Sequence, residues 1–289
     1  MIYRSGQKVL VQGITGKQGT FWSQKMMEMG TSVVAGVNPK RAGETHLGVP
    51  VFASAVEATR QIACDISVIF VPPMLARDAI VDAIDAGIGC VVVLTEHIPA
   101  QHVLEIHARA KRAGCRIVGP NTAGIVTPGE GFVGIMPGHN PNIFKPGHVG
   151  VISRSGSLGT LICLNLTRAG LGQSAFIGIG GDPMIGTTTR DALEALDRDE
   201  RTHAIAMIGE IGGTMEEEAA EYARTMRKPI ASFIAGRSSP PDKKMGHAGA
   251  IVTGGRGGYA SKREALEQAG VRVVDTPHEI AIALAGVYA

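Results

Sequence analysis

Short runs of valine and isoleucine alternate along the chain with longer amphipathic stretches. Each run is bounded by glycine or proline, which is typical of a strand buried on both faces of a parallel sheet. In the first half these runs lie at residues 8–14, 32–38, 66–72, 90–96 and 116–120. The stretches between them, such as 74–87 and 100–114, repeat apolar residues with helical spacing and end in glycine. The alternation predicts β-α-β-α units with a parallel sheet.

A second series of apolar runs follows at residues 148–153, 174–180, 204–211, 229–236 and 271–276. Residues 127–147 separate the two series and are dense in proline and glycine, so we interpret them as an inter-domain connection. We therefore predict the α/β class with two doubly wound domains, Rossmann-like over 1–126 and flavodoxin-like over 148–289. In such folds ligands bind beyond the carboxyl ends of the strands, which directs attention to the residues that follow each strand.

Length and composition narrow the class of protein. The 289 residues suggest about two domains, and the net charge of +2 with 4% aromatic residues argues against a nucleic-acid partner. No apolar run approaches the roughly 18 residues of a membrane helix, and no secretory signal is visible. The four cysteines are far apart and form no C-x-x-C motif, so no metal site is expected. These features predict a cytoplasmic protein without a membrane partner.

A glycine-rich turn follows the first predicted strand. Gly13, Gly16 and Gly19 would let the backbone approach a phosphate at a helix N-terminus. Their spacing is G-x-x-G-x-x-G, which departs from the dinucleotide fingerprint G-x-G-x-x-G. After the second strand, Lys40 and Arg41 stand where a nicotinamide site would carry an acid. Two cations suit a nucleotide with an extra phosphate, either NADP or coenzyme A (CoA), although a solvated surface loop has the same composition.

Two further strand ends of the first domain carry small polar or acidic residues. Thr95 and Glu96 end the fourth strand and would face the same crevice. The Glu96 carboxylate would either contact a ligand or cap the helix that follows Pro99. Residues 119–129 close the fifth strand with glycine, proline and small polar residues.

The second domain places anion-binding turns near a histidine. Residues 151–160 and 177–189 are strand-to-helix turns rich in serine, threonine and glycine, and both are expected to present helix N-termini to an anion. Glu210 ends the third strand of this domain, and His247 lies after the fourth in a segment rich in glycine and alanine. An imidazole in that crevice would accept a phosphoryl group and hand it on. The alternatives are a flexible surface loop for His247 and a helix-capping role for Glu210.

Seven motifs carry a resemblance over nearly the whole chain. They are "QGITGKQGTF", "THLGVPVF", "GPNTAGIVTPGE", "VGVISRSGSL", "GIGGDP", "MIGEIGG" and "MGHAGAI". In this order and spacing the chain resembles the α subunit of succinate–CoA ligase. The resemblance implies an N-terminal domain that binds CoA and a C-terminal domain with a transiently phosphorylated histidine. It also implies a separate β subunit, in an αβ or α₂β₂ complex, whose ATP-grasp domain binds ATP or GTP with Mg²⁺.

The resemblance also assigns residues to the reaction. It makes His247 the phosphohistidine and Glu210 the carboxylate that holds it. The implied CoA contacts are Thr15, Gly16, Lys17, Gln18, Arg41, Leu94, Thr95 and Glu96, and the implied substrate and phosphate contacts are Ser153, Ser155, Gly156, Ser157, Thr160, Asn121 and Thr122. In the implied reaction His247 phosphorylates a dicarboxylate, and the CoA thiol then displaces phosphate from the acyl phosphate.

Three positions depart from the succinate enzymes. Thr122 and Ala123 replace a Cys-Pro pair, and Thr160 replaces a tyrosine. Together with "GIMPGH" they are similar to the malate–CoA ligase branch, so a hydroxylated dicarboxylate is an alternative substrate. A non-enzymatic CoA-binding protein is a second alternative, but it would have no use for "MGHAGA" and "GEIGG". An NADP dehydrogenase is a third, and the glycine spacing counts against it.

Overall fold

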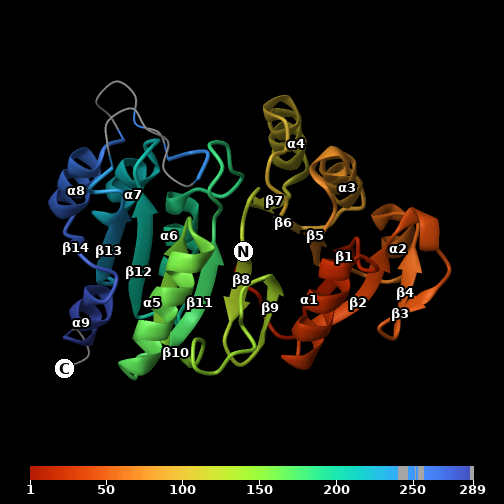
Figure 1. Cartoon of the computed structure of the whole chain (residues 1–289), viewed down its shortest axis with the longest axis horizontal. Coiled ribbons are helices and arrows are strands. Elements are labelled where there is room, and N and C mark those ends of the chain that lie inside the picture. The colour runs from red at the N-terminus through yellow and green to blue at the C-terminus, as the bar shows by residue number, and fades with distance from the viewer. Residues whose placement is uncertain (240–246, 251, 253–256, 287–289) are drawn as a thin grey trace.

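The computed structural model describes residues 1–239, 247–250, 252 and 257–286. Two seven-stranded sheets lie side by side, and helices cover both (Figure 1). We call the first sheet with helices α1 to α4 the first unit, and the second sheet with α5 to α9 the second unit. Among the described residues, no helix combines the length and the apolar character needed to cross a bilayer.

The first sheet has the Rossmann strand order. Its neighbours run β4-β2-β1-β5-β6-β7, all parallel, with β3 antiparallel to β4 at the edge. The strands are β1 (Lys8–Gln12), β2 (Ser32–Val37), β3 (Thr45–His46), β4 (Val49–Phe52), β5 (Ile66–Ile69), β6 (Cys90–Val93) and β7 (Arg116–Val118). The short strands β3 and β4 were not among the predicted strands. The predicted runs extend past the true strand ends because their last residues belong to the turns that follow the strands.

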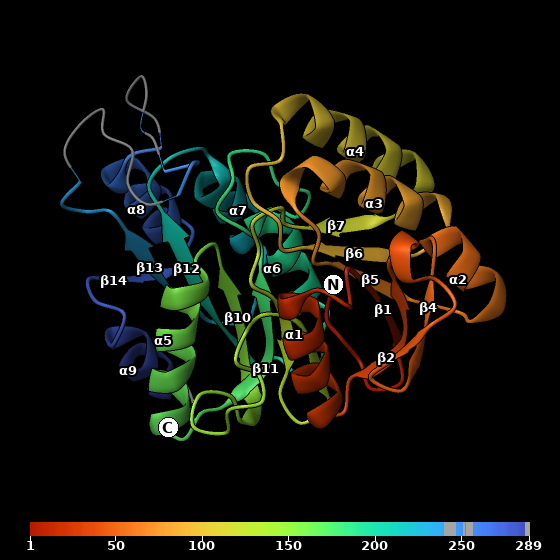
Figure 2. The same cartoon turned by 45° about the vertical axis from the view of Figure 1, so that its right-hand side comes forward.

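The helices of the first unit divide between the two faces of the sheet. Helices α2 (Ala55–Gln61), α3 (Pro73–Asp85) and α4 (Ala100–Ala113) pack in a row over one face (Figure 2). Helix α4 ends as predicted at a glycine, because Gly114 adopts a left-handed conformation with φ 66°. Helix α1 (Lys17–Glu28) packs against β1 and β2, and a short 3-10 turn, η1 (Pro39–Arg41), follows β2.

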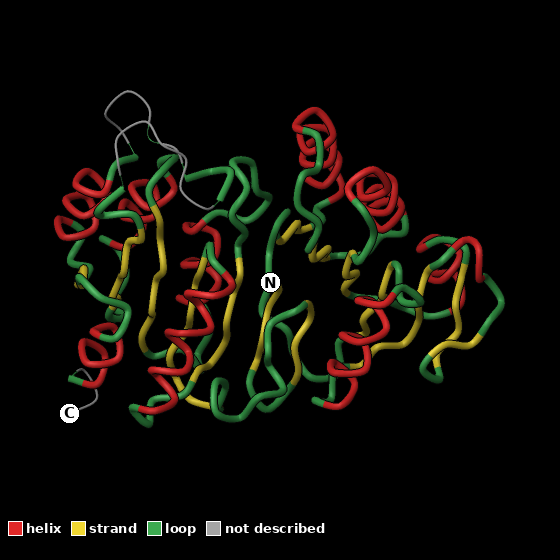
Figure 3. The backbone as a smooth tube through the Cα atoms, viewed as in Figure 1, coloured by secondary structure: helices red, strands yellow, loops and turns green. Residues whose placement is uncertain are grey.

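The second sheet has the flavodoxin-like order that the sequence predicts. Its parallel strands run β14-β13-β12-β10-β11. They are β10 (Pro146–Ser153), β11 (Gln173–Gly178), β12 (Ala204–Glu210), β13 (Ile230–Ala235) and β14 (Arg272–Val274). Helices α6 (Thr189–Asp197), α7 (Met215–Ala223) and α8 (Tyr259–Gln268) pack together, and α5 (Gly156–Arg168) packs with α9 (Glu279–Ala285) (Figure 3).

The proline- and glycine-rich segment 127–147 is more than the connection that its composition suggests. Strands β8 (Gly124–Thr127) and β9 (Gly131–Gly134) form an antiparallel hairpin, and β8 pairs with β11. The hairpin therefore extends the edge of the second sheet. Its glycines serve strand pairing, because a Cβ at Gly124 (φ 102°) would lie 2.1 Å from the Val133 carbonyl oxygen.

We expect Gly124→Ala to destabilise the fold more than the same substitution at a glycine that has a positive φ but no close neighbour. Gly170 has φ 79° with no atom within 4 Å of an added Cβ, so Gly170→Ala should cost about 1 kcal/mol of unfolding free energy. Gly124→Ala should cost about 2 kcal/mol more, because the β8–β9 backbones must separate. Thermal unfolding of the two variants measures the difference. Equal shifts in Tm would contradict this role for Gly124.

The hairpin also contacts the first unit. Thr31 Oγ1 donates to the Phe132 carbonyl (2.8 Å) and accepts from the Phe132 N–H (3.0 Å). Thr127 Oγ1 donates to the Tyr3 carbonyl at 2.7 Å, and α1 packs against β9. The two units thus contact each other along the β8–β9 hairpin, and we call this contact the seam.

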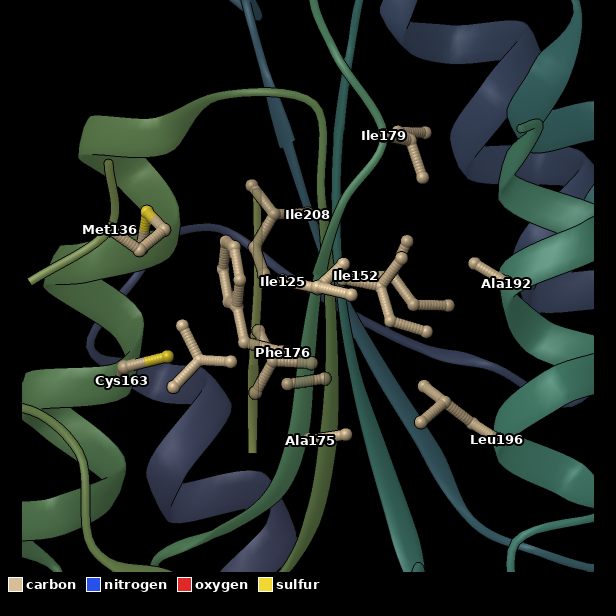
Figure 4. Packing of buried hydrophobic residues seen from close by; sticks show 14 of the residues in the cluster. Ile125, Met136, Ile152, Cys163, Ala175, Phe176, Ile179, Ala192, Leu196 and Ile208 are labelled. Atoms are coloured by element: carbon tan, nitrogen blue, oxygen red, sulfur yellow. The ribbon is translucent and has the colours of Figure 1, made fainter. Parts of the chain in front are cut away.

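Buried side chains pack on both faces of the second sheet. Figure 4 shows Phe176 of β11 between the sheet and α5, near Cys163, while Ala192 and Leu196 of α6 cover the opposite face. Gly159 of α5 makes room for the Phe176 ring, since a Cβ there would lie 2.6 Å from Cε2. The same cluster of buried residues includes Tyr3, Met26 and Phe132. One hydrophobic core therefore extends from the second unit to the N-terminal residues and α1.

Candidate active site

The structure brings His247 and Glu210 together. His247 Nδ1 lies 2.7 Å from Glu210 Oε2, although the residues are 37 positions apart in the sequence. Glu210 is the last residue of β12 and is buried, while His247 is partly exposed. Strand β12 borders β10, where the strand order reverses direction. The pair therefore lies at the switch point of the sheet, which is the usual ligand site of this architecture.

The carboxylate of Glu210 determines the state of the imidazole. Its hydrogen bond raises the pKa of His247, burial lowers it, and the charges of Glu210 and Asp182 raise it against the opposing effect of Arg154. Because a carboxylate accepts, Nδ1 carries the proton in this bond. The neutral ring then has its lone pair on Nε2, which is the atom that would act as a nucleophile.

Glycines let the backbone lie directly against the imidazole. A Cβ at Gly181, in the loop after β11, would lie 2.5 Å from His247 Cγ. The Gly249 N–H donates to the Gly181 carbonyl at 3.2 Å, and the Ala250 N–H donates to the His247 carbonyl at 3.1 Å. The small residues around His247 therefore allow the two loops to close on each other.

Arg154 is a site residue that the sequence reasoning did not identify. It follows β10 directly and is 4% exposed. Its Nε lies 3.2 Å from Glu210 Oε1, and its Nη1 donates to the Gly212 carbonyl at 3.2 Å. A signal was present in the sequence, because Arg154 is a cation inside the turn 151–160. The turn was interpreted from its serines alone. A buried guanidinium at this place suits a phosphoryl or carboxylate oxygen.

The serine turn after β10 begins helix α5. Ser155 Oγ accepts from the Leu158 N–H at 3.3 Å and lies 3.2 Å from Ser157 Oγ. Ser153 Oγ is buried and donates to the Ser155 carbonyl at 2.6 Å. Ser153 and Ser155 therefore shape the turn, and Gly156 forms the first residue of the helix, where N–H groups lack intrahelical partners.

The second predicted anion turn leads into helix α6, which begins with a capping box. In this box the Thr188 N–H donates to Asp191 Oδ2 at 2.8 Å and Thr188 Oγ1 accepts from the Asp191 N–H at 3.1 Å. Thr187 Oγ1 donates to the Ile117 carbonyl. The Asp191 carboxylate therefore already lies at this helix N-terminus, and the anion site predicted for this turn stays a prediction.

Three predicted substrate contacts donate hydrogen bonds to other groups of the protein, namely Asn121, Thr122 and Thr160. Asn121 Nδ2 donates to Asp182 Oδ1 at 3.0 Å, and Thr122 Oγ1 donates to the Gly178 carbonyl. Thr160 Oγ1 donates to the Gly156 carbonyl at 2.8 Å. The first two residues thus join the turn after β7 to the end of β11, and Thr160 bonds to its own helix.

The first unit presents the start of α1 to the same region. Gly16 is the N-cap of α1, and no side chain among the described residues caps it. Gly16, Lys17 and Gln18 are exposed, and Thr15 Oγ1 accepts from Asn38 Nδ2. The N–H groups of this first turn are therefore available to an anion.

The other predicted CoA contacts lie at two strand ends. Arg41 is exposed in η1, and its Nη2 lies 2.6 Å from Glu44 Oε2, so its charge is partly compensated. Leu94, Thr95 and Glu96 follow β6. Thr95 Oγ1 donates to the Val71 carbonyl at 2.8 Å, and Glu96 is exposed.

One cleft contains members of both groups, namely Gln18, Leu94, Thr95 and Glu96 from the first unit and Arg154, Gly156 and His247 from the second. It has a volume of about 640 Å³ and receives residues from both units. We call it the inter-unit cleft. Its polar and charged lining includes Gln18, Thr95, Glu96, Asn121, Arg154 and His247. A molecule that contacts the start of α1 can therefore extend to the imidazole through one continuous space.

Known proteins with similar sequences decide the family. The CoA binding domain family matches residues 5–97, and the CoA-ligase family matches residues 152–272. Succinate–CoA ligase (ADP-forming) subunit alpha 2 of Archaeoglobus fulgidus is 51% identical, over 95% of this chain and 94% of its own length. The chain belongs to the succinate–CoA ligase α-subunit family.

Other succinate–CoA ligase α subunits are similarly close. The protein from Aquifex aeolicus is 50% identical over 94% of this chain and 90% of its own length. Among solved structures, ATP citrate lyase from Methanothrix soehngenii, in complex with citrate and coenzyme A, matches with a TM-score of 0.91 and 25% identity. That match covers 100% of this chain and 50% of the lyase chain.

In this member of the succinate–CoA ligase α-subunit family, the two matched regions correspond to the two units. The CoA-binding match covers α1 and extends to the residues just after β6, and the CoA-ligase match contains Arg154, Glu210 and His247. The inter-unit cleft is therefore lined by residues from both matched regions.

Proposed function

We propose that this chain is the catalytic α subunit of a dicarboxylate–CoA ligase that acts with a β subunit and forms ADP and phosphate. His247 carries the phosphoryl group between the partner's nucleotide and the acid. The observation that carries the proposal is the His247–Glu210 pair, whose histidine lines a cleft that reaches Gln18 in the first turn of α1. Membership of the family and the CoA-binding match support it.

The first step places a phosphoryl group on the imidazole. The Nε2 lone pair forms a bond to the γ-phosphorus of ATP held by the β subunit, with Mg²⁺ on that partner, and the bond to the ADP oxygen breaks. The ring then carries a positive charge, and the Glu210 carboxylate on the Nδ1 proton stabilises it. The Nδ1 proton stays in the hydrogen bond throughout.

Arg154 and the first turn of α5 are the groups that would bind the phosphoryl oxygens. Arg154 is buried next to Glu210, and Gly156 lines the inter-unit cleft with His247. A fixed guanidinium and free helix N–H groups stabilise charge that develops in transfer without needing to reorganise. Ser153, Ser155 and Ser157 hold that turn in shape.

The second and third steps use the cleft between the units. A carboxylate oxygen of the acid attacks the phosphorus, the N–P bond breaks, and an acyl phosphate forms. The CoA sulfur then attacks the acyl carbon, and phosphate leaves with the thiol proton. We assign CoA to Thr15, Gly16, Lys17, Gln18, Arg41, Leu94, Thr95 and Glu96, and the acid to the side near Asn121, Thr122 and Thr160.

The chain with its β subunit, ATP and CoA is expected to consume thiol only when an acid is present. Loss of free thiol, measured with a thiol reagent, and release of phosphate should match in amount. The Glu96→Gln variant, assayed in the same way, should show a higher KM for CoA, because Glu96 lines the part of the inter-unit cleft that we assign to CoA. Binding of CoA without any acid-dependent turnover would instead support the non-enzymatic alternative.

The identity of the acid has one specific alternative, malate. Thr160 and Ala123 are smaller than the tyrosine and proline of the succinate enzymes, which leaves room for a hydroxyl group. This alternative predicts a kcat/KM for malate at least equal to that for succinate, measured in the same thiol assay. A tenfold preference for succinate, about 1.4 kcal/mol of transition-state binding, would exclude it.

A further inference from the structure

A fully buried ion pair lies behind the active site. The side chains of Lys262 on α8 and Glu216 on α7 are both 0% exposed, and Lys262 Nζ contacts Glu216 Oε2 directly. Lys262 Nζ also lies 3.2 Å from Glu217 Oε2. Lysine and glutamate are almost never fully buried unless they are paired, so these charges depend on each other.

The pair connects to Glu210 and Arg154. Glu216 Oε1 accepts from the backbone N–H of Glu210 at 3.2 Å, and it lies 4.0 Å from Arg154 Nη1. Gly209 makes this approach to the strand possible, because a Cβ there would lie 2.7 Å from Glu216 Oε1. The two oxygens of Glu216 thus face different partners, one the lysine and the other the end of β12.

The charges alternate in sign from α8 to the cleft. Lys262 contacts Glu216, Glu216 faces Arg154, Arg154 faces Glu210, and Glu210 binds His247. Apolar side chains would fill the same volume without the cost of removing charges from water. The sequence instead places a lysine at the inner face of α8, where its charge compensates Glu216.

We propose that Glu216 and Lys262 are positioning residues, which hold the end of β12 and the Arg154 guanidinium so that Glu210 stays directed at His247. Lys262 compensates Glu216, and this leaves Arg154 free to face Glu210 and the cleft. Without Lys262, the guanidinium would turn toward the uncompensated Glu216. The catalytic consequence of this role rests on the proposed function, but the geometric consequence does not.

The charges that face His247 give the role a measurable signature. They are Glu210 at the end of β12, Arg154 after β10, and Asp182 in the loop after β11. Lys262→Met removes the cation and draws Arg154 away, so the His247 pKa should rise. Glu216→Gln keeps an oxygen for the Glu210 N–H but removes one of the two carboxylates that contact Lys262, so the surroundings of His247 become more positive and its pKa should fall. Each shift is expected to be about 0.3–1 pH unit.

The test is an NMR titration of the imidazole signals of the full-length chain. His247 is assigned by the signal missing from His247→Asn. We expect opposite shifts in the two single variants and a return to within about 0.2 pH unit of the parent in Lys262→Met/Glu216→Gln. Unchanged pKa values, or shifts of the same sign, would overturn the proposal. If one single variant fails to fold, the His247 pKa of the other single variant is compared with that of the double variant. The double variant is expected to fold, since buried ion pairs tolerate neutralisation of both partners.

A matched control is Arg263→Met, next along α8, whose partly exposed side chain pairs with Glu267 and Asp275. It should leave the His247 titration unchanged, and a shift comparable to that of Lys262→Met would contradict the proposal. With the β subunit added, Lys262→Met should lower kcat about tenfold and leave the KM for CoA unchanged. Shifted titrations without any phosphoryl transfer in the parent protein would disprove the proposed function and preserve the positioning role.

Discussion

His247→Asn is expected to abolish phosphoryl transfer to the chain. Asparagine keeps a hydrogen-bond donor for Glu210 but has no nitrogen lone pair that attacks phosphorus. Turnover should fall about 10³-fold or more, as for loss of a covalent nucleophile. The measurement incubates the chain and its β subunit with ATP labelled at the γ-phosphate. The parent protein should retain label that acid removes and base does not, and the variant should retain none.

A second histidine provides the control. His203 lies just before β12, and its ring stacks on that of His148 with centroids 4.2 Å apart. His203→Asn should therefore take up label as the parent does. Label that persists in His247→Asn would show that another residue receives the phosphoryl group, and the proposed mechanism would fail.

Glu210→Gln is expected to slow the transfer and to change its pH dependence. The glutamine oxygen still accepts from Nδ1, but it lacks the charge that stabilises the imidazolium and balances Arg154. Loss of such an orienting carboxylate typically costs about 10–100-fold in rate. The rate of histidine phosphorylation in a single turnover, followed against pH, checks both effects.

The sign of the pH change follows from the raised pKa of His247. The attacking ring must be neutral, so the parent loses activity as the pH falls through that raised value. Glu210→Gln removes the largest cause of the increase, and its acidic limb should lie at lower pH. Glu221→Gln, in an exposed part of α7, should leave the limb in place. An acidic limb of Glu210→Gln that coincides with the parent's would contradict the role of the carboxylate.

The parallel strands could be predicted because each is buried on both faces and therefore reads as a continuous apolar run. The hairpin of β8 and β9 could not be predicted in this way. Gly131 and Gly134 have positive φ values and allow close contact between strands, but in the sequence they have the composition of a loop. Strand β4 contains Pro50 and was hidden for a related reason, since proline at a sheet edge resembles a turn.

The pairing of Glu210 with His247 followed from topology, because residues after neighbouring parallel strands meet at one edge of a sheet. The buried charges behind them did not follow. Lys262 stands in the polar sequence "SKREALEQ", which gives no sign that one lysine points inward. Its burial depends on Glu216, 46 positions away, and on the space that Gly209 leaves, so only the packed fold reveals it.

The seam between α1 and the hairpin has a consequence for how the chain selects its ligands. Thr31 bonds to Phe132, and Thr127 bonds to Tyr3, so hydrogen bonds and a shared core join the two units that line the inter-unit cleft. The distance from the start of α1 to the imidazole is then set by the protein. Under the proposed function, a thiol ester would form only when the flexible arm of CoA is long enough to span that distance. A shortened analogue that keeps the nucleotide end of CoA should bind and still fail to react.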